Sequence, residues 1–297
     1  MDLISLGECL VEFTRRDDGD WRAGFAGDAV NVLVHAARLG RRCGFISCVG
    51  NDLFTSLIVD GLKREKIDMR MVQHLADRRN GMYFIETDPE GERAFHFWRD
   101  DSAATRTLRD GDLDAISSYA SAAEFFLITG VTLAVMGEDE RVRLLLQRVR
   151  DTGTRIVLDT NYRERLWTSS EDYRHRIDNI LPFVSIFLPS LTDIERVWPG
   201  RDLRDLCAGL ASVGVETIVV KNGANGVMSY DGGALNAIPS LPNPTVIDTT
   251  GAGDAFNAGF LSALTESASR VDAIETGQRA AFSVLSARGA LGGNDGS

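Results

Sequence analysis

The sequence has little cysteine and no long apolar run, and both absences narrow the classes of protein that it could represent. Its 297 residues include four cysteines, none of them in a Cys-x-x-Cys pair. Isolated cysteines among apolar neighbours predict buried thiols in a reducing cytosol, with no disulfide and no structural zinc. No stretch approaches the roughly 18 consecutive apolar residues that cross a bilayer, and the first residues lack a signal-peptide pattern. We therefore expect a cytoplasmic protein.

Positive charge is also scarce. Lys and Arg number 32 against 43 Asp and Glu, which gives a net charge of −11. A field of this sign repels nucleic acids and anionic membranes, so we expect neither as a partner. The four histidines show no metal-ligand spacing. With 44% hydrophobic residues, the chain can bury a core large enough for one domain with a smaller appendage.

Short runs of β-branched and aromatic residues alternate with helical patterns along most of the chain. This alternation is typical of parallel strands joined by crossover helices. The expected strands span residues 3–6, 44–49, 125–128, 155–158, 186–188 and 217–220. The expected helices span residues 29–39, 53–65, 138–150, 191–198, 203–211, 255–264 and 273–287. The predicted fold class is α/β, with a doubly wound, mostly parallel sheet flanked by helices.

One segment interrupts the alternation. Strand patterns at 71–75, 81–87 and 92–98 follow one another without a helix, and a turn sequence occupies 88–91. Together with a strand at 11–14, they predict a small β sheet that covers a site as a lid. The lid would be discontinuous, from about 11–25 and 71–99, within a single domain over 1–297. Because an exposed sheet favours pairing with a second copy, we also expect a homodimer through the lid.

The most informative stretch is Asp-Thr-Thr-Gly-Ala-Gly-Asp at 248–254, before a helical pattern. Glycines at alternate positions before a helix let backbone N–H groups turn inward at its positive end, where they bind an anion such as phosphate. Gly251, Ala252 and Gly253 form the predicted catalytic turn, and the backbone N–H groups of Ala252, Gly253 and Asp254 are the predicted anion hole. Asp254 is the predicted base that takes a proton from an attacking hydroxyl, although such an aspartate alone could be only a helix cap. The P-loop and the protein-kinase catalytic loop are absent.

This run resembles the second signature of the ribokinase-like (PfkB) family of carbohydrate kinases. An earlier part of the chain resembles the first signature of the same family. It consists of residues 24–31, followed by Ala-Ala-Arg-Leu-Gly at 36–40 and Val-Gly-Asn-Asp at 49–52. Within the family, the resemblance is closest to kinases of the sugar acid 2-keto-3-deoxygluconate, through residues 27–31, 99–104 and 159–163. The resemblance implies an α/β core with a β lid, ATP and Mg²⁺ as partners, and phosphorylation of a sugar hydroxyl.

The resemblance also assigns a substrate side. Arg99 and Arg163 would bind the carboxylate of the sugar acid, because the guanidinium group is a fork suited to carboxylate. Tyr83 would cover the sugar, although a strand tyrosine is as often half-buried packing, and Phe97 lacks the hydroxyl expected at its place. The full substrate set is Gly27, Asp28, Asn31, Tyr83, Phe97, Arg99, Arg163 and Asp254.

On the nucleotide side, residues 221–226 resemble the Lys-x-Gly-x-x-Gly loop of the family. Ser190 and Asp193 stand where many members have Asn-x-x-Glu, and this departure predicts a weak magnesium shell in which Asp193 acts through water. Ser190 would serve equally as a helix N-cap. The full nucleotide set is Asn161, Ser190, Lys221, Gly223, Gly226, Gly251, Gly253 and Ser283.

The expected reaction is transfer of the ATP γ-phosphoryl group to the terminal hydroxyl of 2-keto-3-deoxygluconate. A kinase of the same family for a neutral ketose, like a fructokinase, or for a nucleoside is the first alternative. A catalytically silent sugar-binding protein on the same fold is the second.

Overall fold

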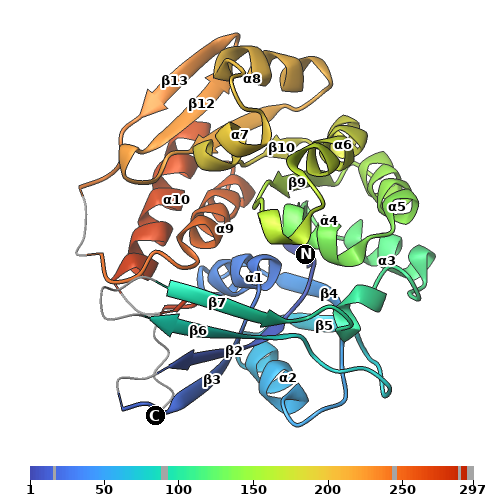
Figure 1. Cartoon of the computed structure of the whole chain (residues 1–297). Helices are drawn as coiled ribbons and strands as arrows, with labels where there is room; N and C mark the ends of the chain where they lie inside the picture. The colour runs from blue at the N-terminus through green and yellow to red at the C-terminus, as the bar shows by residue number, and fades with distance from the viewer. Residues whose placement is uncertain (16–17, 88–92, 243–245, 287–288, 293–297) are drawn as a thin grey trace.

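The computed structural model describes residues 1–15, 18–87, 93–242, 246–286 and 289–292, which form two β sheets and their helices (Figure 1). The larger sheet has the order β13-β12-β11-β10-β9-β8-β1-β4-β5. Its strands are β1 (Leu3–Leu6), β4 (Cys43–Val49), β5 (Asp68–His74), β8 (Phe125–Thr129), β9 (Arg155–Asp159), β10 (Ile186–Phe187), β11 (Thr217–Lys221), β12 (Val227–Asp231) and β13 (Ala234–Ile238). From β11 to β5 all neighbours are parallel, whereas β12 and β13 add an antiparallel hairpin.

Helices cover both faces of this sheet. One face packs against α1 (Asp28–Arg38), α2 (Thr55–Arg64), α9 (Ala252–Thr265) and α10 (Arg270–Leu285). The other packs against α3 (Leu113–Ala120), α4 (Gly130–Met136), α5 (Asp139–Asp151), α6 (Ser170–Ile180), α7 (Leu191–Val197) and α8 (Leu203–Ser212). Short 3-10 turns are η1 (Ala103–Arg106), η2 (Glu164–Leu166), η3 (Leu181–Phe183) and η4 (Gly223–Asn225). The predicted doubly wound α/β class is confirmed.

Strand β8 shows how the two faces are specified. Phe125 and Leu127 lie in the core on the side of α1 and α9, whereas Phe126 and Ile128 lie in the core on the opposite side. Successive side chains of a strand point to opposite faces, so a strand that is apolar throughout must be covered twice. This double burial is why the parallel strands appear in the sequence as short continuous apolar runs.

The smaller sheet has the order β3-β2-β6-β7 and lies beside α2 (Figure 1). Its strands are β2 (Leu10–Arg15), β3 (Trp21–Ala26), β6 (Met82–Thr87) and β7 (Arg93–Trp98). The predicted hairpin of β6 and β7 is confirmed, as is the strand at 11–14, which pairs with β6. The turn predicted at 88–91 lies outside the described residues.

The assignment of residues 71–75 to the lid is wrong. Residues 71–74 belong to β5, which pairs in parallel with β4 at the edge of the larger sheet. The helix α2 lies between β4 and β5 in the chain, so the three form a β-α-β crossover, and such a unit returns its second strand to the same sheet. The lid therefore begins again only at Met82.

Two further properties concern the cysteines and the helices. Cys9, Cys43, Cys48 and Cys207 are buried free thiols. Within the described ranges, every helix is too short or too polar to span a bilayer.

Candidate active site

Polar side chains gather at the carboxyl ends of the parallel strands. Asp159 ends β9, Lys221 ends β11, and Glu8 follows β1 by two residues. Strand β1 lies between β4 and β8, so the order of strands reverses there. Open α/β sheets bind their ligands in the crevice beside such a reversal. The N-terminal half of α9 reaches this edge from a distant part of the chain, because Asn257 in that helix bonds Asp159.

The turn that starts α9 requires glycine at position 251. Gly251 has φ of 76°, in the left-handed region, and a Cβ atom there would lie 2.4 Å from the carbonyl oxygen of Ala290. Ala252 N–H donates to the Thr249 carbonyl at 3.2 Å, so one amide of the predicted anion hole is already engaged. In the described ranges, the N–H groups of Gly253 and Asp254 have no hydrogen-bond acceptor. These two amides are thus available to an anion at the positive end of the helix.

Asp254 is oriented by an amide from α1. Asn31 donates from Nδ2 to Oδ2 of Asp254 at 2.9 Å, and its Oδ1 accepts the N–H of Gly27 at 3.2 Å. The side chain of Asn31 therefore both bonds the backbone at the start of α1 and orients the carboxylate of Asp254. Gly27 is needed because a Cβ atom there would lie 2.2 Å from the carbonyl oxygen of Glu8. The close approach holds the start of α1 against the end of β1.

The electrostatic environment of Asp254 favours its protonated form. Burial raises the pKa of Asp254 to about 8, although the residue keeps some solvent exposure, and the nearby carboxylates of Asp28 and Asp159 act in the same direction. The bond from Asn31 and the charge of Lys221 oppose these effects without cancelling them. A carboxyl group with this pKa can accept a proton near neutral pH.

The side-chain amide of Asn161 contacts Asp28, although the sequence assigns these two residues to different ligands. Asn161, predicted on the nucleotide side, donates from Nδ2 to Oδ2 of Asp28 at 2.8 Å. Its own backbone has φ of 32°, a left-handed conformation that asparagine tolerates better than most residues, and its N–H donates to Asp159 at 3.3 Å. Asp28 also accepts the N–H of Ala29 at 2.8 Å. Asp28 and Asn161 thus form one continuous polar network with Asp159.

Lys221, also predicted on the nucleotide side, is held by two residues that the sequence analysis did not assign. Its Nζ donates to Oδ2 of Asp159 and to Oδ1 of Asn257, both at 3.1 Å, and Asn257 Nδ2 donates to the same Asp159 oxygen at 2.6 Å. A local signal existed for both. Asp159 ends a buried strand, and Asn257 lies three residues after Asp254 on the same helix face.

On the lid side, two glutamates engage the predicted substrate residues. Arg99 forms an ion pair with Glu8, which also accepts the hydroxyl of Ser102. Burial raises the pKa of Glu8, against the lowering effect of Arg99. Tyr83 donates its hydroxyl to Glu12. Glu8 and Glu12 were not predicted, because nothing in the local pattern shows which residues of the lid face them.

The ring of Tyr83 stacks on Phe97, with centroids 5.2 Å apart, and Phe97 is 46% exposed. Tyr83 is buried, so the packing role that was considered for it is present in the structure. Burial and the nearby Glu12 raise the pKa of Tyr83, and the hydroxyl therefore stays a donor. The half-exposed Phe97 ring is left as a surface that a ligand can contact.

The remaining predicted residues stand apart from these bonds. Arg163 is exposed, and its Nη1 donates to the carbonyl of Tyr162 at 3.4 Å. Gly223 and Gly226 belong to the turn η4 and its end after β11. Ser283 is exposed on α10 and donates to the carbonyl of Ala280 at 2.7 Å.

Ser190 and Asp193 are engaged in structural bonds. Ser190 caps α7, because its Oγ accepts the N–H of Asp193 at 3.0 Å. Asp193 is buried and accepts the hydroxyl of Thr160 at 2.7 Å. Among the described residues, no group of three or more His, Cys, Asp or Glu side chains could hold a metal ion. An ion here would depend on ligand phosphates and water for most of its coordination.

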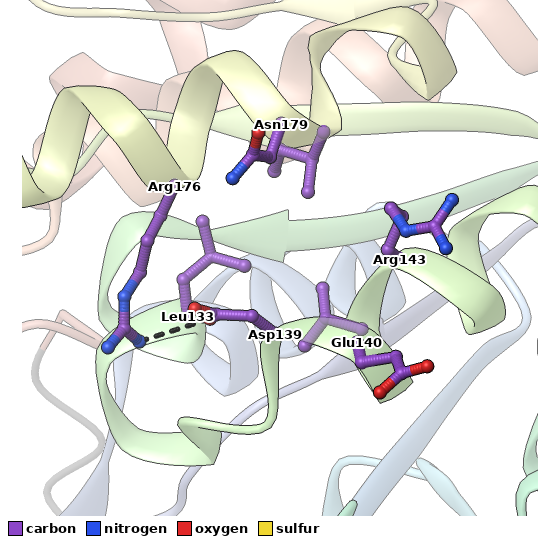
Figure 2. A pocket seen from close by; sticks show the side chains of 8 residues that line it. Leu133, Asp139, Glu140, Arg143, Arg176 and Asn179 are labelled. Atoms are coloured by element: carbon purple, nitrogen blue, oxygen red, sulfur yellow. Dashed lines mark ion pairs between the residues drawn. The ribbon is translucent and has the colours of Figure 1, made fainter.

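A cavity of about 220 Å³ lies elsewhere, between α5 and α6 (Figure 2). Figure 2 shows Arg176 and Asp139 facing each other at its wall, joined by an ion pair of 3.2 Å. The cavity contains no residue of the network around Asp254 and lies in the outer helix layer. The chemistry of the strand ends, rather than this cavity, therefore identifies the candidate site.

Comparison with known proteins places this geometry in a family. The sequence profile described as pfkB family carbohydrate kinase matches residues 1–295. The 2-dehydro-3-deoxygluconokinase of Dickeya dadantii (strain 3937) is 34% identical over 299 residues, covering 98% of this chain and 96% of that protein.

Solved structures agree on the fold. A structure from E. coli in complex with ATP and Mg²⁺ has a TM-score of 0.84 at 24% identity, covering 98% of this chain and 94% of the other. Aminoimidazole riboside kinase from Salmonella enterica, complexed with aminoimidazole riboside and an ATP analog, has a TM-score of 0.82 at 21% identity, covering 98% and 95%. The predicted ribokinase-like fold and family are confirmed. This chain belongs to the pfkB family of carbohydrate kinases.

Proposed function

We propose that this chain transfers the γ-phosphoryl group of ATP to the terminal hydroxyl of 2-keto-3-deoxygluconate, giving 2-keto-3-deoxy-6-phosphogluconate. The observation that carries the proposal is the proximity of two features: the carboxyl group of Asp254, whose pKa is raised to about 8, and the N–H groups of Gly253 and Asp254, which have no acceptor among the described residues. The name and near full-length match of the Dickeya dadantii relative support the sugar acid as substrate.

Asp254 acts as the base. Its carboxylate takes the proton of the attacking hydroxyl as the oxygen bonds to phosphorus, and Asn31 holds that carboxylate in place through the 2.9 Å bond. A base whose pKa is close to the working pH can hold the proton that it removes. At the same pH, a fraction of the free enzyme still carries the ionised carboxylate that is needed to accept that proton. The same raised pKa makes the acid form of Asp254 a suitable donor in the reverse reaction.

The start of α9 stabilises the transferring group. We assign the contact to the N–H groups of Gly253 and Asp254 rather than to Ala252, whose N–H already bonds Thr249. Charge that develops on the phosphoryl oxygens meets fixed donors and the positive end of the helix. Gly251 is needed for this arrangement because its left-handed backbone sets the direction of the first turn.

The sugar acid would lie between the lid and the strand ends. Arg163 is the cation that we assign to its carboxylate, because this side chain is exposed and, among the described residues, donates only to the neighbouring carbonyl of Tyr162. Arg99 also lies on the substrate side, but Glu8 already balances its charge, so it positions the lid as well as contacting the ligand. Gly27, Asp28 and Asn31 face the sugar hydroxyls in this arrangement, with Tyr83 and Phe97 against the sugar ring.

ATP would lie along the ends of β9 to β11 and beside α10. Lys221, Gly223 and Gly226 are assigned to its phosphates and Ser283 to the adenine end, together with Asn161 and the capped turn at Ser190. Mg²⁺ neutralises phosphate charge when it is bound to the nucleotide. The donor set fits an ion held mainly by phosphate oxygens and water, with Asp193 acting through water.

The proposal extends to organisation. A single kinase domain carries the discontinuous lid, and the outer side of that lid presents Trp21 and Trp98, which are 40% and 60% exposed. Such aromatic exposure favours contact with a second copy of the chain, and a homodimer through the lid follows. The free buried cysteines fit a cytoplasmic location.

A coupled assay for ADP release tests the function with 2-keto-3-deoxygluconate, fructose and ribose side by side. The sugar acid should give the highest kcat/KM. Arg163→Ala should raise KM for the acid about tenfold or more and leave the rate with fructose unchanged. Arg165→Ala, an exposed arginine two residues along, is the matched control. A preference for fructose in the wild type would favour the ketose kinase, and no ADP release with any sugar would leave a binding protein.

A further inference from the structure

Lys221 is held in a closed triangle of hydrogen bonds. Its ammonium donates to Asp159 and Asn257 at 3.1 Å each, and Asn257 donates to the same Asp159 oxygen at 2.6 Å. Asp159 and Asn257 are 5% and 0% exposed, so both partners of the ammonium group are buried. A flexible four-carbon side chain is thereby restricted to one position at the end of β11.

The triangle uses two of the three N–H donors of the ammonium group. The third donor has no acceptor among the residues that the structure describes. The ammonium group lies close to Gly253, because a Cβ atom added to that glycine would be 3.9 Å from the Lys221 nitrogen. A cation with one unused donor therefore lies beside an N–H group that also lacks an acceptor. Both would be satisfied by one anionic oxygen placed between them.

Asn257 connects this cation to the start of α9. It lies in the first half of the helix, one turn after Asp254, and its side chain bridges Asp159 of the core sheet and Lys221. The bridge sets the distance between the ammonium group and the amides of the first turn. Burying a charged pair is costly, and apolar residues of similar volume often serve stability equally well. The cluster of Asp159, Asn257 and Lys221 is therefore better explained by a function that requires the lysine charge at a fixed position.

We propose that Asp159 and Asn257 are positioning residues that hold Lys221 against the γ-phosphate of ATP, where it acts together with the N–H of Gly253. This inference rests on the proposed function, since it assumes ATP at this site. It narrows the role of Lys221 from general phosphate binding to the phosphoryl group that moves. Asp159 and Asn257 contact neither ligand in this arrangement and act only through the lysine.

The test compares ATP with ADP, because the two differ only in the γ-phosphate. Isothermal titration calorimetry with MgCl₂ present should show that the wild type binds ATP more tightly than ADP. Asp159→Asn and Asn257→Leu should each weaken ATP binding about tenfold and leave ADP binding unchanged. Lys221→Met should cause the same loss, and adding Asp159→Asn to it should change the ratio no further. Glu266→Gln, which breaks an ion pair of 2.6 Å with Arg41 just beyond the other end of α9, is the control.

The outcomes separate the inference from the proposed function. If the wild type binds neither nucleotide, the kinase assignment fails and the inference fails with it. If the wild type discriminates ATP from ADP and both positioning variants keep that ratio, only the inference is overturned. Should thermal melting show that Asp159→Asn does not fold, Asn257→Leu decides the matter, because it leaves the charged pair of Asp159 and Lys221 in place.

Discussion

Replacing Asp28 by asparagine should move the pH dependence of phosphoryl transfer to lower pH. Among the charged neighbours that raise the pKa of Asp254, Asp28 has the largest effect, second only to burial. With that pKa at about 8, about one tenth of the molecules carry the ionised base at pH 7. In the wild type, kcat/KM should therefore rise about tenfold per pH unit below pH 7 and level off above about pH 9.

Asp28→Asn removes a negative charge beside Asp254, so the carboxylate becomes easier to form and the midpoint of the profile falls. The variant also changes the 2.8 Å bond from Asn161, which lowers the overall rate without setting the midpoint. The midpoint is therefore the informative quantity. The measurement is initial-rate ADP release across buffers of constant ionic strength, since screening would otherwise change with pH.

Asp60→Asn is the matched control, because it makes the same change of charge on the exposed face of α2, where Asp60 forms an ion pair with Lys63 at 3.5 Å. Its profile should overlay that of the wild type. An Asp28→Asn midpoint that coincides with the wild type would refute the electrostatic coupling. A wild-type rate that stays flat between pH 6 and pH 9 would refute Asp254 as the base whose ionisation limits the reaction.

Three further changes have defined outcomes. Asp254→Asn should lower kcat by about 10²-fold or more while calorimetry still detects ATP binding, and near-normal turnover would reject its role. Because burial and nearby carboxylates raise the folded pKa of Asp254 from 3.8 to about 8, its ionisation lowers the free energy of unfolding of the wild type as pH rises through this range. In urea unfolding this variant should therefore exceed the wild type by up to about 5 kcal/mol at pH 8 and by about 2 kcal/mol at pH 5. Gly251→Ala should lower the free energy of unfolding by about 2 kcal/mol or more. Its control is Gly137→Ala, which should lower it by about 1 kcal/mol, because φ is also positive there but the added Cβ meets open space. Equal losses of stability in thermal melts would contradict the predicted clash at Gly251. Glu8→Gln leaves Arg99 without its buried charge partner and should cost about 3 kcal/mol in the same unfolding assay, and a change below about 0.5 kcal/mol would show that the pair is unimportant.

Local backbone chemistry explains which elements were predictable. The buried parallel strands appear as short apolar runs because both of their faces are covered, and strands such as β8 fall within one residue of their expected ends. The turn before α9 was equally clear, since alternating glycines before a helix have few other uses. The sequence patterns did not predict helices α4 and α6, for two different reasons. The first has only seven residues, too few for a periodic pattern, and the second buries only Tyr173, Ile177 and Ile180.

Strand β5 shows the limit of local patterns. Its sequence indicated a strand but not the sheet to which it belongs, and the crossover through α2 decided that question. Strand β13 was missed because it forms an edge of the larger sheet and none of its residues is buried, so it lacks the apolar run of a central strand. Sheet membership depends on which strands meet in space, and a short segment carries little information about that.

The chemistry of the site divides along the same line. The carboxylate, the glycine turn and the lysine were recognisable from sequence, because each depends on residue type and on conformation within a few neighbouring positions. Their partners were decided by folding, since Asn31 and Asp254 are separated by 223 residues, and Asn257 and Asp159 by 98. Burial and the approach of Asp28 raise the pKa of Asp254, and both exist only once distant segments have packed together. Short-range sequence therefore supplied the reactive groups, including the lysine, whereas long-range packing supplied their orientation, their charge state and their positions relative to one another.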